Sequence, residues 1–138
     1  MNDKELTQLL TEAKNIAVVG LSSKPSRASF GVARFLQRQG YRIIPVNPAE
    51  TAVLGERAYA RIADVPDAID IVDVFRRSEA VPDVLEDALS KKPRCFWMQE
   101  GVVHEEAALR AMAAGIPVVM DRCILKEIAR LLPPRYDQ

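Results

Sequence analysis

The sequence predicts an α/β domain built on one parallel sheet of five strands, with helices on both faces. Two observations predict this class. Short apolar runs alternate along the chain with segments of helical periodicity, and few residues connect most of them. The runs are apolar on both faces, which is typical of buried parallel strands. Because crossovers between parallel strands are right-handed, few topologies remain. We expect a Rossmann-like sheet with the strand order 3-2-1-4-5, numbered along the chain.

The bulk composition limits the class of protein. The 138 residues suit one domain spanning residues 1–138. Lys plus Arg and Asp plus Glu number 19 each, and this zero net charge argues against general nucleic-acid binding. The polar, acidic start differs from a signal peptide, and the longest apolar runs are far shorter than a membrane span. We therefore expect a cytoplasmic protein that binds neither nucleic acid nor membrane.

The first half of the chain reads as helix, strand, helix and strand. The first helix begins with Asn2 and Glu5 in the spacing of a capping box. A glycine ends the first strand, and an Asn-Pro pair ends the second. We expect these four elements over residues 3–13, 16–20, 29–39 and 41–46.

The second half begins with a less regular stretch and then continues the alternation. Residues 49–68 carry a turn signal at Gly55, a segment at 58–60 that suits brief strand pairing, and one helical turn at 63–66. Ser78 is expected to cap the helix that follows the third strand. We expect the remaining strands over 69–75, 94–98 and 116–120, and the helices over 78–89, 104–114 and 124–132.

The loop after the first strand is the first candidate ligand site. Gly20 allows a sharp turn that brings backbone N–H groups close to a ligand, and Ser22 and Ser23 add hydroxyls. The next helix begins with free N–H groups that favour a phosphate, and Lys24 and Arg27 add positive charge nearby. A polar connector with a basic rim is the plainer interpretation. Because this loop lies where the strand order reverses, we favour a phosphate.

A standard NAD site fits this loop poorly. Such a site has closely spaced glycines and an acidic residue at the end of strand two, whereas strand two ends here with the sequence IPVNP (residues 44–48). No carboxylate stands there, and Glu50 follows only after the proline break. The apolar lip around Val46 suits the face of an adenine ring. This departure argues against ordinary NAD without excluding it.

Strands three and four end in side chains expected at the same edge of the sheet. The residues 75–77 offer an aromatic ring and two arginines, which suit a second phosphate. A core phenylalanine followed by a solvated basic turn is an equally good interpretation. The residues 99–101 form a turn that would bring polar groups over a ligand, whereas Trp97 before it is expected in the core.

Four stretches at these strand ends together resemble the small stand-alone CoA-binding proteins. They are VVGLSSKPSRASFGVARFLQRQGYRIIPVNP, DIVDVFRRSE, WMQEGVVHEEA and AGIPVVMDRC, which follow in order along nearly the whole chain. The fold of that family matches the N-terminal CoA-binding domain of the succinyl-CoA synthetase alpha subunit. The resemblance implies that the chain binds coenzyme A or an acyl-CoA at the carboxyl edge of the sheet.

The resemblance also implies which residues contact the cofactor. The loop after strand one would hold the phosphates, and the end of strand two would border the adenosine. The end of strand three would flank the ligand, and the loop after strand four would lie near the pantetheine arm. An acidic residue on strand two would repel the 3′-phosphate of CoA, and arginines would attract it. The implied residues are Gly20, Leu21, Ser22, Ser23, Arg27, Val46, Asn47, Pro48, Phe75, Arg76, Arg77, Gln99, Glu100 and Gly101.

The sequence contains no recognisable catalytic constellation. The synthetase works through a phosphorylated histidine in a later domain, and His104 here has no base, metal set or nucleophile in its neighbourhood. Cys95 and Cys123 are too few for a disulfide framework or a tetrahedral zinc site. Both cysteines read as packed side chains, although Cys123 lies near a helix start and could pair with a ligand thiol. We expect no metal, no catalytic residue and no reaction by this chain alone.

Two other functions remain open. One is an NAD(H)-binding sensor or redox protein whose glycine fingerprint has degraded. The other is a CoA-binding component of a multi-chain acyl-CoA ligase, completed by a protein partner of unknown identity.

Overall fold

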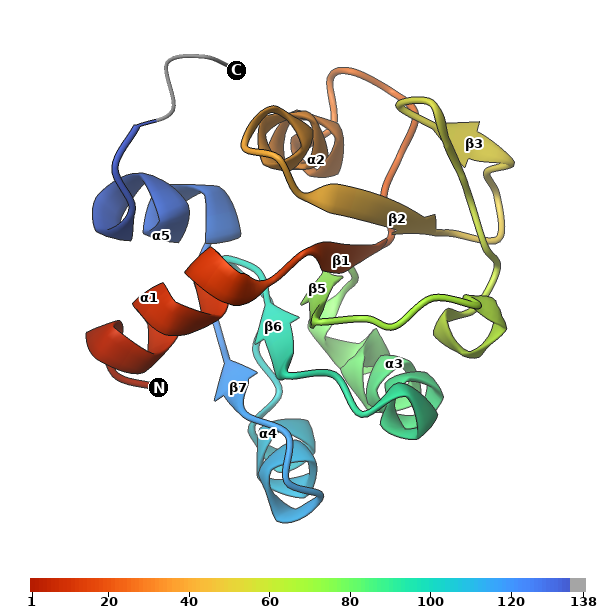
Figure 1. The fold of residues 1–138 in the computed structure, drawn as a ribbon. Coiled ribbons are helices and arrows are strands. Elements are labelled where there is room, and N and C mark those ends of the chain that lie inside the picture. The colour runs from red at the N-terminus through yellow and green to blue at the C-terminus, as the bar shows by residue number, and fades with distance from the viewer. Residues whose placement is uncertain (135–138) are drawn as a thin grey trace.

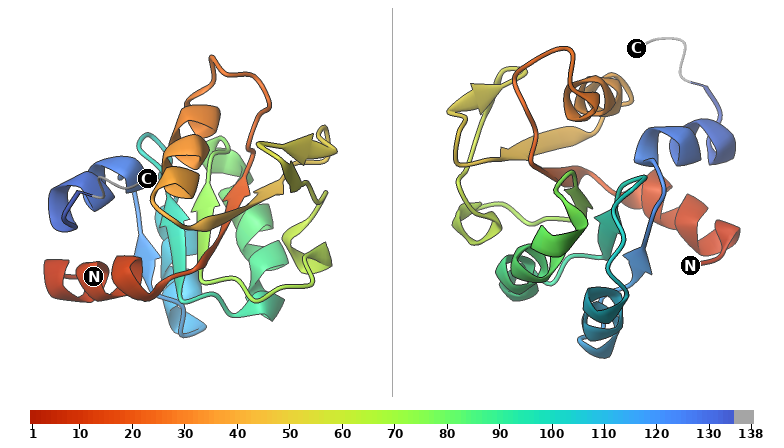
Figure 2. Two further views of the ribbon diagram at one scale, coloured as in Figure 1. Left: turned by 45° about the horizontal axis from the view of Figure 1, so that its top comes forward. Right: turned by 180° about the vertical axis from the view of Figure 1, so that it is seen from behind.

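The structure, a computed structural model, describes residues 1–134 and confirms the five-stranded parallel sheet (Figure 1). All four pairings of neighbouring strands are parallel. The strands therefore point the same way, toward the edge at which the loop after the first strand rises (Figure 2, left). The strands are β1 (Asn15–Val19), β2 (Arg42–Val46), β5 (Ile71–Val74), β6 (Cys95–Met98) and β7 (Val118–Val119).

Helices cover both faces of the sheet, as predicted (Figures 1 and 2). One face carries α1 (Asp3–Glu12), α2 (Ala28–Arg38) and α5 (Ile124–Leu131), and the other carries α3 (Val81–Ala88) and α4 (Glu105–Ala113). Each helix turns an apolar side to the sheet, and removing that surface from water is the main stabilising contribution. None of the helices within residues 1–134 combines the length and the hydropathy needed to cross a membrane.

The predicted strand order 3-2-1-4-5 is wrong. The observed order, β2-β1-β5-β6-β7, is 2-1-3-4-5 along the chain. The third strand pairs with β1 along its whole length, and the Asp70 carboxylate supports the pairing by accepting the N–H groups of Lys14 and Asn15, at 2.8 and 2.9 Å. The free edge of β2 is meanwhile occupied by Tyr59, which forms a parallel bridge with Val46. The order still reverses beside β1, so the switch point lies at the predicted strand end.

The irregular stretch between β2 and β5 forms short elements at that free edge. An antiparallel hairpin of β3 (Ala52–Val53) and β4 (Glu56–Arg57) turns at Gly55, and a 3₁₀ turn, η1 (Ile62–Asp64), follows. The turn predicted at Gly55 is confirmed, and the brief pairing predicted at 58–60 is confirmed by the bridge of Tyr59 to Val46. The predicted helical turn is present, at 62–64 in place of 63–66. Asp87 of α3 accepts the N–H groups of the first two η1 residues, which ties this stretch to the helix.

The helix starts show one confirmed and one wrong prediction. Asn2 and Glu5 form the predicted capping box on α1. Ser78 does not cap α3, because residues 78–80 form a separate 3₁₀ turn and the helix begins at Val81. The Ser78 hydroxyl instead accepts the Val103 N–H at 2.9 Å and so holds the loop before α4.

Candidate functional site

Gly20, directly after β1, is the residue on which the candidate site is built. Its φ is +86°, in the left-handed region that strains residues with a side chain. A Cβ at this position would lie 2.3 Å from the carbonyl oxygen of Phe75 and 3.1 Å from Cδ of Arg76. Glycine therefore allows the ends of β1 and β5 to meet at the switch point.

An open cleft of about 440 Å³, here called the loop cleft, lies between the loop after β1, the start of α2 and the turn after β2. Arg27, the N-cap residue of α2, makes no side-chain capping hydrogen bond within the described residues. Lys24 and Arg27 make no ion pair with any other residue of the 1–134 segment. An uncapped helix N-terminus beside two free cations attracts an anion. The lining residues are Gly20, Ser22, Lys24, Arg27, Ala28, Ser29, Asn47, Ala49, Glu50 and Phe75.

Backbone N–H groups of this loop are held by acceptors within the chain. The Ser22 N–H donates to Ser29 Oγ at 3.1 Å, and the Lys24 N–H donates to Ser22 Oγ at 3.1 Å. The Ser23 N–H donates to Glu50 Oε2 at 2.8 Å. The loop is therefore ordered around side-chain oxygens, one of which belongs to a carboxylate.

Glu50 lies in the loop cleft, although the end of β2 itself carries no carboxylate, as the sequence indicates. Asn47 explains how Glu50 reaches the cleft. Its Oδ1 accepts the Ala49 N–H at 2.9 Å and its carbonyl accepts the Glu50 N–H at 3.1 Å, which turns the chain back toward β1. Its Nδ2 donates to the Leu21 carbonyl at 3.1 Å and fixes the turn against the β1 loop. An acid therefore reaches this cleft from the turn after β2, so the absence of an acid on β2 counts less against NAD.

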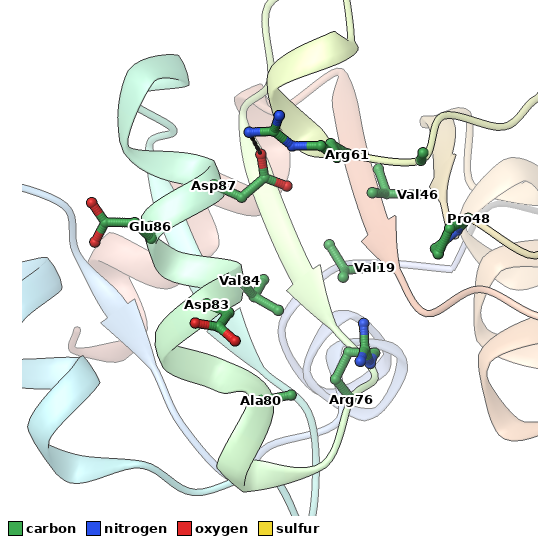
Figure 3. Close-up of a pocket in the computed structure, with 11 residues that line it drawn as sticks. Val19, Val46, Pro48, Arg61, Arg76, Ala80, Asp83, Val84, Glu86 and Asp87 are labelled. Carbon is green, nitrogen blue, oxygen red and sulfur yellow. Dashed lines mark ion pairs between the residues drawn. The ribbon is translucent and has the colours of Figure 1, made fainter.

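A second open cleft of about 460 Å³, here called the α3 cleft, lies between the carboxyl edge of the sheet and α3 (Figure 3). Val19 and Val46 face it from β1 and β2, and Val84 faces it from α3. These side chains give the cleft an apolar floor on which a flat ring could lie. The lining residues are Val19, Val46, Pro48, Ala60, Arg61, Arg76, Ala80, Asp83, Val84, Glu86 and Asp87.

Charged side chains surround the apolar floor of the α3 cleft. Arg61 Nη2 lies 3.7 Å from Asp87 Oδ1, the pair drawn with a dashed line in Figure 3. Arg76 enters from the end of β5 and makes no ion pair with another residue of the described chain. The Cδ atom of Arg76 also approaches Gly20, which lines the loop cleft. The free cation of Arg76 therefore lies at the boundary of the two clefts.

The two clefts gather most of the predicted site residues. Leu21 is fully buried, so only its backbone is available to the site, whereas Arg77 is exposed and lines neither cleft. Ser23 is also exposed and is not among the lining residues, but its N–H borders the loop cleft because it donates to Glu50, which lines it. Of the others, Gly20, Ser22, Arg27, Asn47 and Phe75 line the loop cleft, and Val46, Pro48 and Arg76 line the α3 cleft.

The loop after β6 lies outside both linings, and its polar groups have structural partners. Gln99 is 4% exposed, and its Oε1 accepts the Ile124 N–H at 2.9 Å, at the start of α5. Glu100 pairs with Lys126 at 2.8 Å, and the Gly101 N–H donates to Asp121 at 2.7 Å. Assigning these three residues to the pantetheine arm stays a prediction.

Two buried titratable groups lie in the middle of the sheet. Asp73 on β5 is fully buried, and within residues 1–134 neither of its carboxylate oxygens has a hydrogen-bond partner. Burial raises the pKa of the Asp73 carboxyl well above its ordinary value. Burial also raises the pKa of the Cys95 thiol to about 12, and the charge of Asp73 acts in the same direction. The Cys95 thiol is therefore protonated at neutral pH and is a poor nucleophile.

Other reactive side chains have structural roles. His104 is the N-cap residue of α4, and its Nδ1 accepts the Ala107 N–H at 3.1 Å. Cys123 is the N-cap residue of α5 and packs against the apolar cluster on that face. Trp97 is core, as predicted, and its Nε1 donates to the Arg122 carbonyl. Over the described part of the chain, no three His, Cys, Asp or Glu side chains gather as metal ligands would.

The sequence-based prediction missed Glu50 and the acidic side of α3. The Asn47-Pro48 pair indicates the end of a strand, and the same pair also signals a turn that returns the chain. Asp83 and Asp87 are spaced i, i+4 and so lie on one side of a helix. That spacing could have identified an acidic rim, but only a known strand order places it beside β1 and β2.

Comparison with known proteins identifies the family. The family model for the CoA binding domain matches residues 14–129. YneT, an uncharacterised protein of Bacillus subtilis, is 45% identical over 120 residues, which cover 87% of this chain and 89% of that protein. The ADP-forming acetate–CoA ligase II of Archaeoglobus fulgidus is 30% identical over 80 residues, or 56% of this chain and 12% of the ligase.

Solved structures show the same fold. A Thermus thermophilus protein, cell-free ID.343, is 44% identical with a TM-score of 0.93, covering 96% of this chain and all 100% of its own. The dinucleotide-forming acetyl-coenzyme A synthetase 1 of Ca. Korarchaeum cryptofilum is 26% identical with a TM-score of 0.70, over 78% of this chain and 26% of the enzyme. With the family model matched over residues 14–129, the chain belongs to the family of CoA-binding domains.

Proposed function

We propose that this chain binds coenzyme A or an acyl-CoA across the two clefts at the carboxyl edge of the sheet. The proposal rests mainly on the way the loop cleft and the α3 cleft meet at Gly20. On one side lie the uncapped start of α2 and the free cations Lys24 and Arg27, and on the other lies the apolar α3 cleft. Arg76 stands between them. Anionic groups linked to a flat ring, as in CoA, suit this arrangement.

Each part of the ligand has a matching surface. The diphosphate would lie in the loop cleft, where the helix N-terminus and the charge of Arg27 favour it. The adenine ring would lie against Val46 and Pro48 in the α3 cleft. The 3′-phosphate would face Arg76, whose guanidinium can donate two parallel hydrogen bonds to phosphate oxygens.

We further propose that binding occurs without a reaction catalysed by this chain alone. His104 and Gln99 support helix starts through hydrogen bonds, and the Cys95 thiol is buried and protonated. The bound cofactor would then be sensed, carried or presented to another protein.

A second candidate function is the CoA-binding component of a multi-chain acyl-CoA ligase. The match to the Archaeoglobus fulgidus ligase favours it, and that match spans 12% of the ligase. The remaining steps would need another chain. Turnover of acyl-CoA by a co-purified complex, absent from the isolated chain, is the result expected from this candidate.

The proposed function is tested by calorimetric titration of the purified protein with CoA, 3′-dephospho-CoA and NADH. We expect CoA to bind more tightly than dephospho-CoA, and NADH to bind weakly. NADH is a necessary competitor because Glu50 reaches the loop cleft, where an acid suits a ribose hydroxyl. Binding of NADH without binding of CoA would refute the proposal.

A further inference from the structure

Glu50 places a carboxylate where the proposed function places a phosphate. Its Oε2 lies 2.8 Å from the backbone nitrogen of Ser23, in the loop above the start of α2. A carboxylate that accepts a backbone N–H beside a helix N-terminus has the geometry of a bound anion. Glu50 lines the same cleft as Lys24 and Arg27, yet it forms no ion pair with either.

The acceptors on the neighbouring N–H groups differ in charge. Ser22 and Lys24 donate to serine hydroxyls, which are neutral. The Ser23 N–H donates to a group with a full negative charge. A ligand phosphate that approaches this loop therefore meets a like charge, and it competes with that charge for the Ser23 N–H.

The local structure allows Glu50 to leave without unfolding the turn that carries it. The turn after β2 is held independently by Asn47, through Nδ2 to the Leu21 carbonyl and through Oδ1 to the Ala49 N–H. Pro48 and Ala49 are exposed, so the core does not repack when the Glu50 side chain rotates outward. A change of side-chain rotamer is enough to free the donor.

We propose that Glu50 is a built-in surrogate for the ligand's phosphate: it occupies the Ser23 N–H until the ligand's diphosphate displaces it. This inference rests on the proposed function, because it concerns the same cleft. The surrogate keeps the loop ordered without ligand and lowers the affinity for phosphate compounds. Only a ligand with enough further contacts, such as a nucleotide diphosphate, overcomes the competition.

The test compares wild-type protein with Glu50→Gln by calorimetric titration with CoA. Glutamine keeps the shape and an acceptor oxygen but removes the charge. We expect Glu50→Gln to bind CoA about fivefold more tightly, or better, because a like charge within a few ångströms of the phosphate is gone. Pantetheine, which has no phosphate, should bind both proteins equally. Thermal unfolding without ligand checks that the variant is folded.

Glu105→Gln is the matched control, because Glu105 is an exposed carboxylate on α4 and its loss changes the net charge equally. It should bind CoA as the wild type does. Equal affinity of Glu50→Gln and wild type for CoA would overturn the proposed surrogate role. Glu50 would then only hold the loop in place. Weaker binding by Glu50→Gln would also overturn that role, since the carboxylate would then assist the ligand.

Titration with inorganic pyrophosphate separates this inference from the proposed function. If CoA binds neither protein, the proposed function fails. In that case, tighter binding of pyrophosphate to Glu50→Gln than to wild type would still support the role of Glu50 as a surrogate. Pyrophosphate binding that is equal for the two proteins, or undetectable for both, would then overturn that role.

Discussion

Asp73 is a fully buried carboxyl group on β5. Within the described chain neither of its oxygens is hydrogen-bonded, and burial raises the pKa of this carboxyl. In the unfolded chain the same carboxyl ionises near pH 3.9. The unfolded state therefore releases a proton that the folded state keeps. The free energy of unfolding should fall as pH rises from about 4 toward the raised pKa of the folded state, by up to about 1.4 kcal/mol per pH unit.

Asp73→Asn should remove this dependence. The asparagine stays neutral, so the unfolding free energy of the variant relative to wild type should increase as the pH rises from about 4 toward the raised pKa of Asp73, and should then level off. Urea unfolding at several pH values measures the difference. Hydrogen bonds from Arg130 and Arg94 lower the pKa values of Asp3 and Glu12. Both groups are present in both proteins, so their contributions to the pH dependence of stability cancel in the difference. A difference that does not change with pH would show that Asp73 ionises freely in the fold.

Arg76→Ala should weaken CoA binding more than dephospho-CoA binding. The guanidinium stands free at the boundary of the two clefts, and losing its charge-assisted hydrogen bonds should cost about 1.5–3 kcal/mol, or tenfold and more. Calorimetry with both ligands measures the effect. Arg34→Ala removes an exposed arginine from the middle of α2 and serves as control. Equal losses for the two ligands would place Arg76 away from the 3′-phosphate.

At the scale of elements, Asp70 joins the beginnings of three strands. Its carboxylate accepts the N–H groups of Lys14 and Asn15, its own N–H donates to Asn15, and its carbonyl accepts from Arg94 and Cys95. These bonds place β5 between β1 and β6. The site depends on this placement, since Phe75 and Arg76 reach Gly20 only because β5 is the neighbour of β1.

Asp70→Ala should lower the free energy of unfolding by about 1–3 kcal/mol, because two backbone donors lose their acceptor. Urea unfolding measures this, and an unchanged denaturant slope would show that the fold is kept. Asp64→Ala, at an exposed position of η1, should change stability little. A wild-type stability for Asp70→Ala would mean that the carboxylate does not help to fix the strand neighbours, and that the backbone bonds and packing suffice.

The elements were predictable from sequence because their signals are local. The capping box on α1, the apolar runs and Gly20 lie within short windows of the chain. The strand order was not predictable, because Asp70 and Tyr59 act on residues far away in the sequence. Glu50 was missed for the same reason, since it meets Ser23 only through the turn at Asn47. The family resemblance named half of the residues that line the loop cleft and fewer than half of those that line the α3 cleft, and it gave no contact between them.

At the scale of the molecule, the two clefts lie on either side of one strand end, and a ligand that fills both would hold β1, α2 and α3 together. A ligand that binds the folded state alone raises the free energy of unfolding by about 2.7 kcal/mol at 100 times its dissociation constant. CoA should therefore raise the unfolding temperature by several degrees. Pantetheine at the same concentration should raise it less. Equal shifts would show that the phosphates do not contribute.

Mapping the CoA site on the backbone amides by NMR tests the central claim most directly. The account predicts that CoA perturbs the amides of residues 20–29, 47–50 and 75–84, which border the two clefts. The amides of α4 away from its first turn should remain unchanged. Perturbations confined to another surface, or none at saturating CoA, would contradict the account.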